Sequence, residues 1–209
     1  MWQRLPDTGG LKSMNKIEDA FKNKKAFIPF VTAGDPSLDV TRELILAMQE
    51  AGADLIEIGI PFSDPVAEGP VIQEADDRAL SAGVTTDKIF DMVDDIADKI
   101  HVPIVFMTYI NPIYVYGVEK FAKRAKACGA AGVIVPDVPF EEKEEIRGSF
   151  EAEGLVVISM VAPTSADRVR MIAKEAKGFL YCVSSLGVTG VRTEIGTAIG
   201  DLIQTVKEE

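Results

Sequence analysis

Six short apolar runs, rich in β-branched residues, recur along the 209-residue chain and constrain its fold more than any other feature. They are apolar throughout instead of alternating with polar residues, which is typical of strands buried on both faces of a parallel sheet. The runs are Ala26–Thr32, Leu55–Ile60, Pro103–Tyr109, Gly132–Pro136, Val156–Ala162 and Phe179–Ser184.

Amphipathic stretches separate these runs and predict helices. They are Leu38–Ala51, Thr86–Ile100, Gly117–Ala127, Phe140–Ala152 and Ala166–Glu175, followed by a last helix within Ile195–Glu208. Strands that alternate with helices predict right-handed βαβ units, and the chain holds six of them.

Two α/β architectures begin in this way, a doubly wound sheet and a TIM (β/α)8-type barrel. The glycine fingerprint of a dinucleotide-binding sheet is absent after the first run, where the loop reads TAGDPS. Polar residues gather instead at the carboxyl ends of the runs, where barrel enzymes hold their sites. They are Thr32, Asp35, Ser63, Asp64, Tyr109, Asn111, Asp137, Ser184 and Ser185. We therefore expect a barrel, and an incomplete one, because a full barrel takes ~250 residues.

The charge and the cysteine content indicate which partners and which cellular compartment to expect. The chain has 22 basic and 33 acidic residues, a net charge of −11, which disfavours a nucleic-acid partner. No apolar run reaches the ~18 residues of a membrane span, so no membrane role is expected. Cys128 and Cys182 lie far apart and predict reduced thiols in a cytoplasmic protein. Residues 1–13 are expected to be a disordered leader or tag-like tail, and residues 14–209 the partial barrel domain.

The residue types leave few kinds of catalysis open. None of the six runs contains a lysine, which disfavours a Schiff-base aldolase. The only histidine, His101, precedes the third run, at the end away from the expected site, so a histidine metal site and a Ser-His-Asp triad are excluded. Carboxylates and tyrosines remain as acid–base groups.

Two carboxylates stand in or beside the second run. Glu57 lies within it, where burial raises the pKa of a carboxyl toward neutrality. By residue type alone, a catalytic Glu57 and a structural one, bonded to a hydroxyl or an arginine, are equally good interpretations. Glu68 follows in a loop of prolines and glycines, and taken alone it is better interpreted as a solvated acid. Asp35 and Asp64 are expected in turns or caps.

Two further loops have alternative interpretations. Asp137, in VPDVP, is expected to cap the predicted helix Phe140–Ala152. The stretch SSLGVTG, Ser184–Gly190, is rich in small residues whose backbone N–H groups suit an anion. A flexible hinge or lid explains that loop about as well as a phosphate site does.

Five motifs in chain order resemble the tryptophan synthase α-subunit family, from about Lys16 to the end of the chain. They are FIPFVTAGDP (27–36), LIEIGIPFSDPVAEGPVIQ (55–73), YINP (109–112), VPDVPFEE (135–142) and YCVSSLGVTGVR (181–192). The resemblance implies a barrel-fold lyase that cleaves indole-3-glycerol phosphate to indole and glyceraldehyde 3-phosphate. That retro-aldol reaction uses no metal and no cofactor.

The resemblance also implies roles for single residues. Glu57 matches the general acid–base, and Glu68 matches the second catalytic acid, which holds the indole N–H. Positions that line the substrate pocket or its closing loop are Phe30, Tyr109, Tyr181, Thr189 and Gly190.

The family partner is a pyridoxal-phosphate β subunit in a heterotetramer. Asp64 and Asn111 match positions on the face that docks to this β subunit.

Two departures from the family pattern bear on activity. The family has aspartate where this chain has Glu68, and a misplacement of ~1 Å can cost ~100-fold in rate. We expect weakened and not abolished catalysis from this change. The family's last two βα units are also absent, which predicts a C-terminally shortened barrel with open edges on its first and sixth strands.

Two further functions stay open from the sequence. A truncated, non-catalytic module could bind or regulate a β subunit, since the docking residues are present. Alternatively, two chains could complete each other's barrels by pairing their open strands.

Overall fold

The computed structural model describes residues 16–22, 24–183 and 198–208. Each of the six apolar runs contains at least one short β-strand. The strands are β1 (Phe30–Thr32), β2 (Ile56–Gly59), β3 (Ile104–Met107), β4 (Gly132–Ile134), β5 (Val156–Val157), β6 (Ser159–Val161) and β7 (Leu180–Cys182). The fifth run is interrupted at Ile158 and so holds both β5 and β6. The predicted leader, residues 1–13, lies outside the described residues.

Helices follow the strands as the amphipathic stretches predict. They are α1 (Lys16–Ala20), α2 (Leu38–Glu50), α3 (Pro70–Ser81), α4 (Thr86–Asp94), α5 (Ile110–Tyr116), α6 (Val118–Ala127), α7 (Glu144–Ala152), α8 (Ala166–Glu175) and α9 (Ala198–Lys207), with 3-10 turns η1 (Ala97–Lys99) and η2 (Phe140–Glu142). Two predicted helices, Thr86–Ile100 and Phe140–Ala152, are each divided into an α-helix and a 3-10 turn.

Three helices, α1, α3 and α5, were not expected from the sequence. The helix α3 begins at Pro70, directly after its N-cap Gly69, because proline is tolerated in the first turn of a helix. Proline likewise lies in the first turn of α5, which ends where Gly117 takes a φ of 92°. The prolines and glycines around Glu68 were interpreted as loop up to Pro70, where α3 begins instead.

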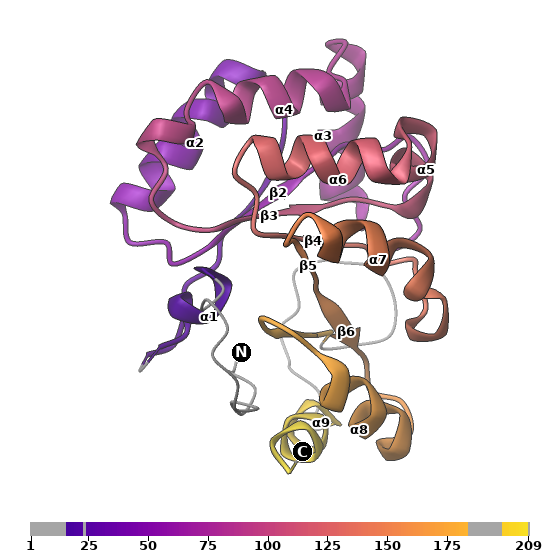
Figure 1. The fold of residues 1–209 in the computed structure, drawn as a ribbon. Coiled ribbons are helices and arrows are strands. Elements are labelled where there is room, and N and C mark those ends of the chain that lie inside the picture. Colours follow the sequence, from indigo (N-terminus) through magenta and orange to yellow (C-terminus); the bar gives the residue numbers. More distant parts are fainter. Residues whose placement is uncertain (1–15, 23, 184–197, 209) are drawn as a thin grey trace.

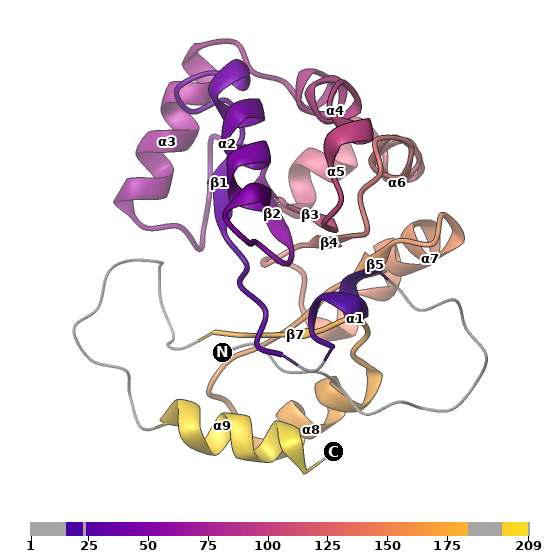
Figure 2. The ribbon, with the colours of Figure 1, turned by 90° about the vertical axis from the view of Figure 1, so that its left-hand side faces the viewer.

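All the strand pairs are parallel and the strands lie side by side in chain order. The order is β1-β2-β3-β4-β5 in one sheet and β6-β7 in a second. A doubly wound sheet would reverse its strand order at a switch point, and this order does not reverse. The helices from α2 onward lie along the outer side of the curved strand layer, with α8 and α9 beside each other at its far end (Figures 1 and 2). The arrangement is that of a barrel wall.

The wall ends at β1 and at β7. Within the described ranges β1 pairs only with β2, and β7 only with β6. Both edges are therefore open in this part of the chain, as expected.

The strands separate two apolar clusters. Ile56 and Ile58 belong to the outer cluster, packed under the helices. Leu55 belongs to an inner cluster, where Ile17 and Phe21 of the α1 segment join it from the opposite side of the strands (Figure 1). Because side chains alternate along a strand, Glu57 points to the same side as Leu55, into the barrel interior.

Asp137 corrects one expectation about capping. Its carboxylate accepts hydrogen bonds from the backbone N–H of Ile110, at 3.0 Å and 3.3 Å. Asp137 therefore caps the first N–H of α5. The turn η2, which follows Asp137 in the chain, has no side-chain cap. The reason is that α5, unseen in the sequence, brings an unsatisfied N–H close to the end of β4.

The contact between β4 and β5 predicts a strict requirement for glycine at position 132. A Cβ there would lie 2.5 Å from the carbonyl oxygen of Val156, a backbone atom that cannot move aside. Gly132→Ala is expected to lower the free energy of unfolding by about 2 kcal/mol or more. Urea denaturation followed by circular dichroism would measure the change.

Gly148→Ala is the matched control, because a Cβ at Gly148 in α7 has open space around it. There the substitution should raise stability by ~0.5–1 kcal/mol, through helix propensity. Equal stability changes at the two glycines would contradict the packing account.

Candidate active site

Glu57 is the buried charge of the barrel interior. Its side chain is 3% exposed, and its strand partners in register are Phe30 of β1 and Val105 of β3. Burial raises the pKa of its carboxyl to about 7. A group with such a pKa can both take and give a proton near neutral pH.

One carboxylate oxygen of Glu57 lacks, among the described residues, the partner that a structural role would supply. Among the described residues its Oε1 atom has no hydrogen-bond partner, and the same holds for the Oγ1 atoms of Thr32 and Thr108. Buried polar atoms are normally paired, so an unpaired Oε1 in the barrel interior suits a place where a ligand supplies the missing contact. The interpretation of Glu57 as bonded to a neighbouring hydroxyl or arginine finds no such contact at Oε1.

Glu68 is held in place by its surroundings and is 9% exposed, so it is not a solvated loop acid. The hydroxyl of Tyr109 donates to its Oε1 at 3.1 Å, and the same hydroxyl accepts from the N–H of Ala67 at 3.0 Å. The amide of Gln73 in α3 donates to the Glu68 carbonyl at 2.8 Å. Tyr109 thus anchors the loop between β2 and α3.

Tyr109 stays a hydrogen-bond donor over the whole neutral range. Burial raises the pKa of its hydroxyl, and the charge of Glu68 raises it further. Its ring also packs on Phe62 of the same loop, with ring centres 5.5 Å apart. The loop therefore contacts Tyr109 at two points on either side of its turn.

Tyr181 and Phe30 complete the inner wall. Burial first, and then the charges of Glu57 and Glu68, raise the pKa of Tyr181 to about 12, so both carboxylates act on this residue of β7. The ring of Phe30 lies over the Cα of Gly59, where a Cβ would come within 2.6 Å of it. The structure thus brings the predicted residues of β1, β2, β3 and β7 toward one region.

The other predicted site residues lie apart from this interior. Asp64, in the loop after β2, and Asn111, in α5, are both exposed at the carboxyl ends of neighbouring strands. Thr189 and Gly190 lie outside the described residues.

Asp76 is a buried acid that sequence reasoning missed. It lies in α3, is 6% exposed, and has its pKa raised to about 7, chiefly by burial. A backbone hydrogen bond from Phe62 lowers that pKa, while the charge of Glu68 raises it. The burial of Asp76 could have been predicted only if the helix α3 had been predicted first, because Asp76 lies on the buried face of that helix with Ala75 and Ala79.

A second link fastens the same region. The guanidinium of Arg78 in α3 donates to both carboxylate oxygens of Asp35, at 2.7 Å and 2.9 Å. This bond lowers the pKa of Asp35, which is thus more than a turn residue. It joins the loop after β1 to the helix that follows the Glu68 loop, and fixes two neighbouring loops relative to each other.

The described residues contain no group of three or more His, Cys, Asp or Glu side chains able to hold a metal ion. Nor does any described helix have the length and apolar character needed to cross a membrane.

The sequence matches known proteins along nearly its whole length. It is 49% identical over 196 residues to the tryptophan synthase alpha chain of Halalkalibacterium halodurans, covering 93% of this chain and 74% of the relative. The corresponding protein of Geobacillus kaustophilus is 50% identical over 186 residues, covering 88% of this chain and 69% of the relative.

Solved structures agree with this match. Tryptophan synthase of Mycobacterium tuberculosis superposes with a TM-score of 0.83 at 33% identity, over 92% of this chain and 74% of the other. The tryptophan synthase α2β2 complex of Pyrococcus furiosus gives 0.80 at 41% identity, over 88% and 74%. These likenesses confirm the predicted barrel-type α/β fold.

The family model described as tryptophan synthase alpha chain matches residues 17–209. With this match and relatives near 50% identity, the chain belongs to the tryptophan synthase alpha chain family.

Proposed function

We propose that this protein is a carbon–carbon lyase of tryptophan biosynthesis, which cleaves indole-3-glycerol phosphate to indole and glyceraldehyde 3-phosphate. Family membership supports the reaction. The observation that carries it for this chain is Glu57, a carboxyl buried in the barrel with its pKa near 7 and no partner at Oε1 among the described residues.

The reaction requires one proton to arrive and another to leave. A proton added at indole C3 leaves a positive charge on the ring nitrogen. The hydroxyl on the adjacent glycerol carbon then loses its proton, the bond from that carbon to C3 breaks, and its electron pair returns to the ring. The aldehyde and indole are the products. Glu57 serves both transfers in this proposal and ends in its starting state.

Glu68 is assigned to the ring nitrogen. A carboxylate there accepts the indole N–H and stabilises the positive charge that forms on the ring. The hydroxyl of Tyr109 donates to Glu68 Oε1, and this contact supports a fixed position for a side chain one methylene longer than the aspartate of the family. Phe30 and Tyr181 are proposed to contact the indole, and Thr189 and Gly190 to close over the glycerol phosphate.

The proposed macromolecular partner is a tryptophan synthase β subunit, the pyridoxal-phosphate enzyme of the complex. Asp64 and Asn111 are exposed, and large exposed apolar side chains accompany them at this end of the barrel. These apolar residues are Val66, Val71, Tyr114 and Val115. Exposed apolar side chains beside polar ones suit a protein interface. The two free cysteines are consistent with a cytoplasmic setting for the complex, which is part of the proposal.

A non-catalytic module that only binds or regulates a β subunit is the alternative. It would explain the exposed apolar side chains, but it gives no reason to keep Glu57 buried in the barrel interior with Oε1 unpaired among the described residues. The lyase is therefore favoured.

Glu57→Gln tests the catalytic assignment. The amide keeps the shape of the side chain but cannot exchange a proton, so indole release should fall about 100- to 10,000-fold. A colorimetric indole assay on the purified chain with β subunit present would measure it. Glu43→Gln, an exposed acid of α2, should leave the rate unchanged. If the parent chain releases no indole, the non-catalytic alternative gains instead.

The same variant should be more stable than the parent above neutral pH. The pKa of Glu57 is about 7 in the folded state and near 4.5 otherwise. Between these values the native state holds a proton that the unfolded state has lost, so this residue's contribution to stability falls as pH rises. Glutamine does not titrate, and the stability advantage of Glu57→Gln should grow from about pH 4.5 to 7 and then level at ~3 kcal/mol or less.

Urea denaturation of both proteins from pH 4 to 8 would record the difference. Asp76, whose pKa is also raised, is present in both proteins and cancels. A constant difference across the range would contradict the assignment of a neutral, buried Glu57.

Val115→Asp tests the docking face. Val115 is 82% exposed on α5, so the change should not disturb the fold, but a charge there should weaken binding of a β subunit about tenfold or more. Co-sedimentation at micromolar concentration would show it. Phe27→Asp, at the amino end of β1, alters an exposed apolar residue on the opposite end of the barrel and should have no effect. Equal losses in both variants would argue against this face.

A further inference from the structure

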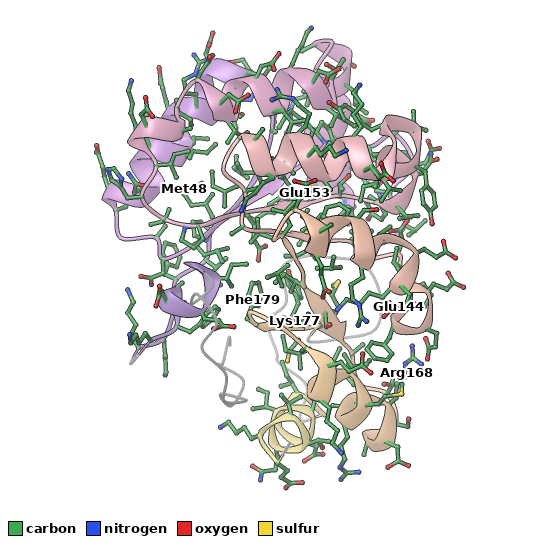
Figure 3. All side chains as sticks on the ribbon, in the orientation of Figure 1. Met48, Glu144, Glu153, Arg168, Lys177 and Phe179 are labelled. Carbon is green, nitrogen blue, oxygen red and sulfur yellow. The ribbon has the colours of Figure 1, made fainter. Side chains whose placement is uncertain are left out.

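A cavity of about 300 Å³ lies away from the two candidate catalytic acids, neither of which lines it. Its walls come from the end of β4, from β5 and β6, and from the segments that lead into α7 and α8. Glu144 at the start of α7 and Arg168 in α8, both labelled in Figure 3, mark the two helices beside it. Cavities of this size are at the lower end of the range that holds small ligands.

A break in the strand layer creates this space. Pairing between β4 and β5 stops at Val133 and Val157, and after Ile158 the chain pairs with β7 instead. The strands β4 and β6 therefore separate toward their carboxyl ends. Ser159, the first residue of β6, is 4% exposed. Val157 and Val161, two residues before and after it, pack in clusters on the helix side, so the alternation of side chains along a strand points Ser159 toward the helices as well.

Lys143, the single residue between η2 and α7, lines the cavity. Its Nζ donates to the hydroxyl oxygen of Ser159 at 2.7 Å, and the side chain is half-buried. Burial, and secondarily the charge of Arg147, lowers the pKa of this amine to about 8. At neutral pH it is still mostly charged, so the cavity holds a partly desolvated cation.

The acids around Lys143 are engaged with other cations. Glu151 pairs with Lys177 at 2.5 Å, and Glu175 pairs with Arg147 at 3.5 Å. In the part of the chain that the structure describes, Lys143 has no carboxylate oxygen within 4.0 Å. A partly desolvated charge without a counter-charge is unfavourable, and an anion that enters the cavity would offset that cost.

Two other charged groups lie in the walls. Arg168 is paired with Glu141, to which it donates at 2.9 Å, and the carboxylate of Asp137 accepts a hydrogen bond from the backbone N–H of Ile110. The remaining lining is largely apolar, with Val135, Ile146, Val161 and Ile172 among its residues. The cavity therefore combines one available positive charge with an apolar interior.

We propose that this cavity is a second ligand site, which binds a small monocarboxylate with an apolar body. The carboxylate pairs with the Lys143 ammonium and accepts a hydrogen bond from the Ser159 hydroxyl, and the apolar body fills the space between α7 and α8. One ammonium and one hydroxyl suit a single negative charge better than a phosphate dianion, which calls for more donors. The site does not depend on the proposed lyase activity.

The test uses 3-phenylpropionate and its neutral amide as probes, titrated into the full chain at neutral pH. Methyl NMR signals of Ile146 and Ile172 would report binding at the site. The acid should cause saturable shifts, and the amide should bind about 10- to 100-fold more weakly, because it cannot pair with a charge. Equal affinity for acid and amide would overturn the proposal.

Lys143→Met keeps the apolar stem and removes the charge, so it should weaken binding of the acid to the level of the amide. Lys177→Met removes a nearby lysine that is already paired with Glu151, and it should leave the affinity unchanged. If Lys143→Met fails to fold, Ser159→Ala serves in its place and should weaken binding of the acid, because the carboxylate loses the hydrogen bond from the Ser159 hydroxyl. Shifts that do not saturate at millimolar probe, or that persist unchanged in Lys143→Met, would overturn the site.

Discussion

The burial of one carboxylate in the barrel interior is the constraint on which the proposed chemistry depends. Taking an ionised carboxylate out of water costs several kcal/mol unless a partner offsets it, and a structural acid would be expected to have one. Glu57 instead keeps Oε1 unpaired among the described residues and has a pKa near 7. The parallel strand pairs on either side hold it there, so its position is as rigid as the barrel wall.

A different kind of support holds the second acid. Glu68 stands on a loop, and the contacts of Tyr109 with Glu68 and Ala67 fasten that loop to the neighbouring βα unit. Asp76 supports the same loop from α3 through Phe62. A loop fastened from both sides can place a glutamate where the family has an aspartate, because the contacts and not the chain length decide where the carboxylate lies.

The sequence predicted the strands well, because continuous apolar runs report burial on both faces directly. It failed at α3 and α5, where proline in the first turn resembles loop sequence, and Asp76 and the capping role of Asp137 were lost with them. The burial of Glu68 could not be predicted either, since it depends on a tyrosine 41 residues away. The roles of Glu57 and Glu68 came from family resemblance; residue type alone had left Glu57 undecided.

The cavity at Lys143 could not be predicted from the sequence either. It arises where the chain changes its strand partner at Ile158, and the apolar run Val156–Ala162 shows no sign of that change. The proposed chemistry depends on the protonation of Glu57, which can be measured directly. Labelling glutamate side chains with ¹³C and following the carboxyl signal of Glu57 through a pH titration, with Glu57→Gln to assign it, gives its pKa. The structure predicts a value of about 7. An ordinary value near 4.5 would mean that the carboxylate is solvated or paired, and would contradict the account.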